Sequence, residues 1–150
     1  MITIKQIIIF FIIIGINVGI GIYILSLSIT LMNKIKKKTE TNEELQSLKN
    51  NLQQWIFIDL FACIVSIYNR IRNFSNTKIN KILLTIDVLQ CMITITYFFI
   101  LSELVSIYKN KKYDKSLTYV RILVIFDIVS VICGIITSVA DVANNVNKKL

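Results

Sequence analysis

The sequence predicts an all-α integral membrane protein, an up-down bundle of four transmembrane helices. Hydrophobic residues make up 55% of the 150 residues, and the mean hydropathy of +0.67 is well above that of an ordinary soluble domain. The apolar residues collect in four long runs, separated by three short connections that are rich in lysine. Short connections force neighbouring helices to run antiparallel. No connection is large enough to bury a core of its own, so we expect residues 1–150 to form a single transmembrane domain.

Three of the runs are long enough to cross a bilayer on their own, because a helix of about 20 apolar residues spans ~30 Å of hydrocarbon. The second run, 52–68, has 17 residues. It reaches about 20 residues if the helix continues to Ile71, with Arg70 extended toward the lipid headgroups. Trp55 and Tyr68 at its two ends favour spanning over the alternative of a helix lying in the interface. The predicted helices cover residues 7–32, 52–71, 82–108 and 117–143.

The connections indicate how the chain enters the second helix and how it is oriented. Residues 41–51 have a helical pattern with Thr41 as the N-cap and Glu44 three residues on, so we expect a helix that leads straight into the second span. The connections 33–51 and 109–116 share one side and carry nine lysines, against seven basic residues on the other side. This small excess favours an inside position for these two connections. The first run is too long for a cleaved signal peptide, so we expect it to be retained.

The residue types present exclude several classes of chemistry. The chain has no histidine, which excludes His-ligated metal or haem and His-dependent nucleophilic catalysis. Cys63, Cys91 and Cys133 each lie inside an apolar run without C-x-x-C spacing, so we interpret them as small apolar residues. We therefore predict a protein that is not an enzyme and has no cofactor, metal site or catalytic residues. The net charge of +8 comes from residues beside the bilayer, which favours attraction to lipid headgroups over nucleic-acid binding.

Each predicted helix carries a stripe of small or polar residues on one face. At helical spacing, the stripes are Gly15, Gly19, Tyr23, Ser26 and Thr30 in the first helix; Asp59, Cys63, Ser66 and Arg70 in the second; Asp87, Gln90, Cys91 and Thr94 in the third; and Asp127, Ser130, Gly134, Thr137 and Asp141 in the fourth. In lipid, small residues let helix backbones approach, and polar side chains bond across helices. We therefore expect all four stripes to face the interior. The predicted helix-packing residues are Gly15, Gly19, Ser130 and Gly134.

Acidic residues inside the runs mark a candidate site, because a charge within a bilayer costs several kcal/mol. The candidate intramembrane polar or ion-pathway residues are Asp59, Asp87, Glu103, Asp127, Asp141 and Arg121. A rise of about 1.5 Å per residue places Asp127 near the middle of its helix. The same arithmetic places Asp59 and Glu103 level with each other and near Arg121, and the other two acids toward the opposite side. One arginine cannot neutralise five acids, so the rest must be protonated, hydrated or paired with another subunit.

Two functions fit these observations. The first is a small multi-pass membrane protein that acts through helix packing, as a structural, assembly or accessory subunit of a larger membrane complex or as a self-associating scaffold. Its partners would be membrane lipids and other membrane subunits or a second copy. The alternative is a homo-oligomeric channel or carrier that conducts cations or protons along the ladder of acidic residues, with Asp127 as its central site.

Overall fold

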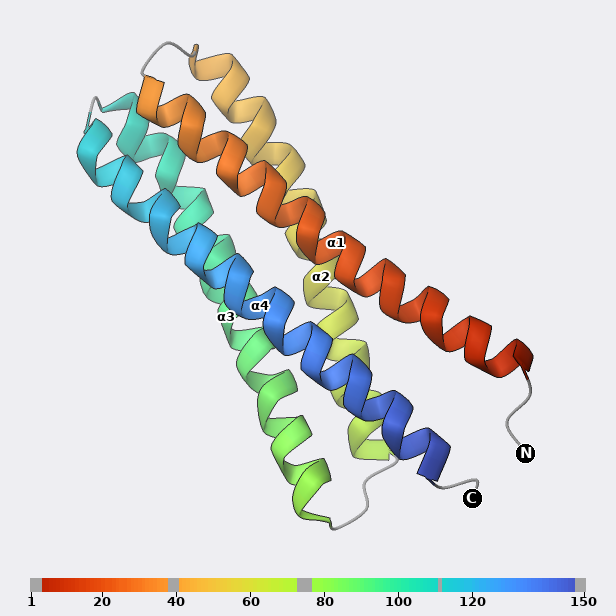
Figure 1. Ribbon diagram of the computed structural model, residues 1–150. Helices are drawn as coiled ribbons and strands as arrows, with labels where there is room; N and C mark the ends of the chain where they lie inside the picture. The colour runs from red at the N-terminus through yellow and green to blue at the C-terminus, as the bar shows by residue number, and fades with distance from the viewer. Residues whose placement is uncertain (1–3, 38–40, 73–76, 111, 148–150) are drawn as a thin grey trace.

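Four long helices make up almost all of the described part of the chain. The computed structural model describes residues 4–37, 41–72, 77–110 and 112–147 (Figure 1). The helices are α1 (Ile4–Lys37), α2 (Asn42–Arg72), α3 (Lys78–Lys109) and α4 (Tyr113–Asn147). Each contains a stretch that is long and apolar enough to cross a membrane. The prediction of an all-helical protein with four such helices is confirmed, including the second and shortest run.

Every helix extends beyond the apolar run that predicted it. The largest extension is in α2, which begins at Asn42 rather than at residue 52. The predicted capping box is present: the Thr41 hydroxyl accepts a hydrogen bond from the backbone N–H of Glu44, and the Glu44 carboxylate accepts one from the backbone N–H of Thr41, both at 3.3 Å. These bonds satisfy two backbone donors that a helix N-terminus otherwise leaves free. The extra turns change the level at which residues of different helices meet.

The helices form a ring in which one junction is looser than the others. α1 packs on α4, α4 on α3, and α3 on α2, with antiparallel neighbours along much of their length. The contact between α2 and α1 that completes the ring is less extensive. These two helices lie together near the connection that joins them and separate toward the N-terminus of α1 (Figure 1). The bundle is therefore closed at one end and splayed at the other.

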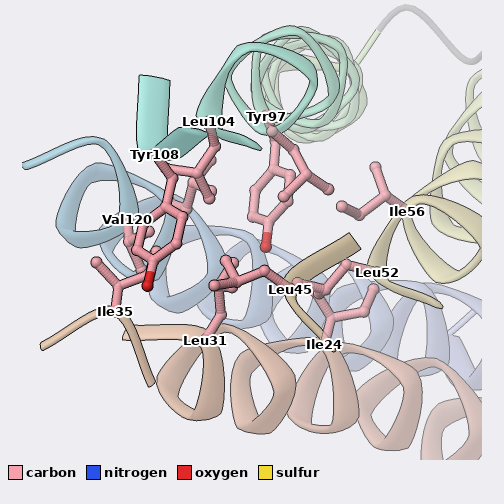
Figure 2. Close-up of a cluster of buried hydrophobic side chains, with 12 residues drawn as sticks. Ile24, Leu31, Ile35, Leu45, Leu52, Ile56, Tyr97, Leu104, Tyr108 and Val120 are labelled. Carbon is pink, nitrogen blue, oxygen red and sulfur yellow. The ribbon is translucent and has the colours of Figure 1, made fainter. Parts of the chain in front are cut away.

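A packed apolar core occupies the closed end, which we call the core half. The core comprises Ile24, Leu31, Ile35, Leu45, Leu52, Ile56, Tyr97, Leu101, Leu104, Tyr108, Val120 and Leu123 (Figure 2). These residues come from the C-terminal halves of α1 and α3 and the N-terminal halves of α2 and α4. Large apolar side chains also cover the outside of the helices, among them Phe11, Phe57, Phe61, Phe99 and Val139. An apolar exterior of this extent is typical of a surface that faces lipid.

Two isoleucines of α1 test this packing. Ile24 is 4% exposed and belongs to the core, whereas Ile22 is 54% exposed on the outer face of the same helix. We expect Ile24→Ala to lower the free energy of unfolding by about 2 kcal/mol, the low end for a buried large-to-small substitution, because lipid is as apolar as the core and only packing is lost. Ile22→Ala should have a much smaller effect. Unfolding of the two variants in detergent by added SDS, followed by far-UV circular dichroism, measures both, and equal losses would contradict the register of α1.

Candidate functional site

A polar cavity of about 120 Å³ lies inside the other half of the bundle, which we call the cavity half. All four helices line it, and its polar lining includes Asn17, Asp59, Asp87, Gln90, Ser130 and Asp141. A cavity of this size has room for several water molecules, since roughly 10–15 Å³ of such space is enough for one. The splaying of α1 from α2 leaves this space where a tighter bundle would have apolar packing.

An ion-pair cluster joins three helices beside this cavity. The guanidinium of Arg70, on α2, donates through Nε to Asp87 of α3. Its two terminal nitrogens donate to the two carboxylate oxygens of Asp141 on α4, at 2.9 and 3.1 Å. The side chains of Arg70 and Asp87 are only 8% and 3% exposed, while that of Asp141 is 47% exposed. Asp87 is therefore a buried carboxylate whose charge is matched inside the chain.

This cluster corrects two expectations about the basic residues. Arg70 does not extend away from the bundle but turns inward to the two carboxylates. Arg121, which the sequence placed near Asp59, is instead exposed on α4. The long arginine side chain can reach either way from a helix end, and the two inward carboxylates make the inward direction favourable.

Asp59 lies level with Thr94 of α3 rather than with Glu103. The Thr94 hydroxyl lies 3.2 Å from Oδ2 of Asp59 and 3.0 Å from the backbone carbonyl of Gln90. Glu103 is exposed and lies nine residues further along α3, about 13 Å away along the helix axis. The prediction that Asp59 and Glu103 lie at the same level is wrong, because α2 begins ten residues earlier than its apolar run and Asp59 therefore meets α3 at a different level.

Asp127 lies at the inner end of the polar region, where it meets the core half. It is 5% exposed, and its Oδ2 has no hydrogen-bond partner within the described parts of the chain. The hydroxyls of Ser28 and Tyr97, which are 2.6 Å apart, also interact with the Asp127 carboxyl group. A second, smaller cavity of about 20 Å³ is lined by Asp127, Asp59, Thr94 and other residues, and it shares part of its lining with the larger cavity.

The structure thus brings together four of the six candidate polar residues. Asp59, Asp87 and Asp141 line the larger cavity, and Asp59 and Asp127 line the smaller one. Ser130 and Gly134 also line the larger cavity, and Gly134 is close to the amide of Gln90. The polar stripes of α2, α3 and α4 therefore face the interior, as expected.

The stripe predicted for α1 faces the wrong way for an interior role. A Cβ atom added at Gly15 or Gly19 would have no neighbour within 4 Å among the described residues, and both glycines are exposed. The face of α1 that meets the other helices instead carries Gly21 and the buried Ser28, and Asn17, although exposed, lines the larger cavity; the sequence reasoning missed these residues. At Gly21 an added Cβ would approach Val131 to 3.0 Å, so this glycine is the one that lets α1 lie close to α4. The sequence does contain a pattern that could have identified this face: Asn17, Gly21 and Ser28 have the spacing i, i+4, i+11, which places them on one side of a helix.

The cysteines form no disulfide, and the described side chains that could bind a metal ion do not gather in groups of three. All three cysteines are free, with Cys63 buried and the other two partly buried. In the described residues, no group of three or more His, Cys, Asp or Glu side chains is placed to hold a metal ion. Comparisons with known protein families, with curated proteins and with solved structures find no match for this chain.

The ion-pair cluster makes a prediction about stability. Arg70→Met leaves Asp87 buried without its cation, and breaking a buried pair in this way typically costs about 3–5 kcal/mol. The double variant Arg70→Met/Asp87→Leu removes both charges, so we expect it to recover most of that loss. Arg72→Met, on the exposed side of the same helix, is the control and should change little. Unfolding in detergent by SDS measures all three, and a double variant as unstable as the single one would contradict the buried pair.

Proposed function

We propose that this chain is a multi-pass integral membrane protein that binds a small cation or proton in its polar cavity and carries it across the bilayer. The observation that supports this most directly is the cavity itself, lined by carboxylates and enclosed by four helices with an apolar exterior. Acidic side chains inside a membrane protein are expensive to keep and usually belong to an ion or proton pathway.

The charges around the cavities favour positively charged cargo. Four aspartates, Asp59, Asp87, Asp127 and Asp141, line the two cavities, and no basic residue belongs to the described lining. Asp87 and Asp141 share Arg70, which leaves the carboxylates of Asp59 and Asp127 without a cationic partner there. Such a surplus of negative charge in a low-dielectric cavity attracts cations and disfavours anions.

The core half closes the route on the far side of Asp127. Ile24, Ile56 and Tyr97 line the smaller cavity or lie next to it, and the rest of the packed core continues beyond them. An apolar constriction of this kind stops hydrated ions. The proposal is therefore a carrier that opens to one side at a time, rather than an open pore.

Reconstitution into liposomes tests the proposal. A potassium gradient with valinomycin supplies a voltage that is negative inside the liposomes. We expect wild-type protein to let this voltage drive cargo inward, measured as acidification of an enclosed pH-sensitive dye for protons and as uptake of radioactive Na⁺ for sodium. Asp127→Asn removes the carboxylate at the inner end of the pathway and should lower the flux at least about tenfold, the size of a barrier increase of 1.4 kcal/mol. Glu103→Gln, on the exposed outer face, should leave the flux unchanged.

Two results would count against the carrier. Wild-type protein that is folded by circular dichroism but gives no flux of protons, Na⁺ or K⁺ would refute it. An Asp127→Asn variant with wild-type flux would remove Asp127 from the pathway.

A second candidate function is assembly with another membrane helix, either of a partner subunit or of a second copy. The outward stripe of α1 favours it, because a Cβ atom added at Gly15 or Gly19 would have no neighbour within 4 Å among the described residues. Small residues spaced by four let two membrane helices approach closely. In this proposal the lysines of the connections contact anionic lipid headgroups, and the chain is a subunit or scaffold rather than an enzyme.

Energy transfer between labelled copies in liposomes tests this second candidate for self-association. Gly15→Ile and Gly19→Ile place branched side chains where backbones would meet, so we expect them to lower the transfer efficiency to the level of random mixing. Ile16→Leu, at a neighbouring exposed position, should retain the wild-type value. Transfer that is equal in all four proteins would exclude this face as the contact between copies.

A further inference from the structure

We infer that one monovalent cation of the Na⁺ class binds in the smaller cavity, between the carboxylates of Asp59 and Asp127. The inference concerns the site itself, and it rests on the proposed function only in naming that ion as the cargo. Both aspartates line this cavity at the centre of the ring of helices. Asp127 is 95% buried, and its Oδ2 is without a hydrogen-bond partner among the described residues.

The hydroxyl groups nearby carry too few protons to satisfy these two carboxylates. Thr94 has one hydroxyl proton, but two acceptors lie within reach of it, Asp59 Oδ2 and the Gln90 carbonyl. The Ser28 hydroxyl lies 3.0 Å from the Ile24 carbonyl and 2.6 Å from the Tyr97 hydroxyl, and both hydroxyls interact with the Asp127 carboxyl group, so their two protons have more acceptors than they can satisfy. The shortage of donors leaves Oδ2 of Asp127 without a hydrogen-bond partner among the described residues, and a bound cation would satisfy it.

The size of the cavity and its oxygen atoms favour a small, hard cation. About 20 Å³ is room for one particle the size of a water molecule. The polar atoms around it are the carboxylate oxygens and the hydroxyls of Thr94, Tyr97 and Ser130, and the described lining has no sulfur or imidazole ligand. Hard cations take oxygen ligands of this kind, whereas softer metals prefer nitrogen or sulfur.

The apolar part of the wall favours a single positive charge over a divalent ion. Much of the cavity wall is isoleucine, phenylalanine and valine. Ca²⁺ requires six to eight oxygen ligands, which a largely apolar wall does not provide, and Mg²⁺ retains several waters, for which a cavity of about 20 Å³ has no room. A monovalent ion is cheaper to desolvate, because the cost rises with the square of the charge.

A bridging cation also explains the separation of the two carboxylates better than a shared proton does. A proton shared between two carboxyl groups requires a direct hydrogen bond between them, and none joins Asp59 to Asp127 in the described structure. An ion can contact both groups across the cavity instead. Because the two cavities share Gly21, Asp59, Ser130 and Val131, the larger one supplies a polar route to this site.

Thermal unfolding of the full chain in mild detergent tests the site. We expect the melting temperature to rise by roughly 5 °C as NaCl replaces choline chloride at constant ionic strength, and the rise to saturate, because a ligand that binds only the folded state stabilises it. Asp127→Asn and Asp59→Asn should abolish the rise, and Glu103→Gln should retain it. Binding of radioactive Na⁺ to wild-type protein, with one site per chain, gives a second measurement if either variant fails to fold.

The outcomes separate this inference from the proposed function. An equal rise with choline, a rise that survives in Asp127→Asn, or the absence of saturable Na⁺ binding would overturn the cation site. If these results accompany proton flux in liposomes, the carrier stands with the proton as its cargo. If Na⁺ binds through Asp127 but no ion crosses the liposome membrane, the site stands and the carrier fails.

Discussion

Arg70 supplies the contact on which the cavity half of the bundle depends. Its guanidinium bonds to a carboxylate of α3 and to another of α4, so one side chain joins three helices in a region where the packed apolar core is absent. Without this partner Asp87 would be a buried charge, which the interior of a membrane protein tolerates poorly. The same cluster leaves the space between the helices open, because it holds them by long polar side chains rather than by filling the interior.

The two halves of the bundle have different physical roles. The core half is packed by twelve apolar side chains and sets the relative positions of all four helices. The same four helices continue into the cavity half, but there α1 separates from α2. The polar residues of this half therefore line a cavity. A site built on rigid helices in this way can hold carboxylates at fixed separations and still remain accessible. Asp127 lies where the two halves meet, because it lines the smaller cavity together with residues of the apolar core.

Much of the fold could be predicted because it depends on local sequence. Run length identified four spans, and Thr41 with Glu44 identified the start of α2. The inward faces of α2, α3 and α4 followed from helical spacing, since their acidic residues strongly disfavour contact with lipid. The face of α1 could not be predicted in the same way. That run has no charge, so its two faces differ little in their free energy in lipid, and packing against α4 at Gly21 decides between them.

The sequence by itself determined that the protein is all-helical, that it has four helices long and apolar enough to cross a membrane, and that four aspartates lie on the faces that line the cavities. These properties follow from apolar length and helical period, which act within single segments. Only the tertiary structure decided which groups meet. Arg70 pairs with Asp87 and Asp141, and Asp59 lies beside Thr94, whereas Glu103 is exposed. These contacts depend on how far each helix continues past its apolar run and on the position of each helix along its neighbours. A shift of a few residues in one helix moves a side chain by one turn, about 5.4 Å, which is enough to exchange its partner.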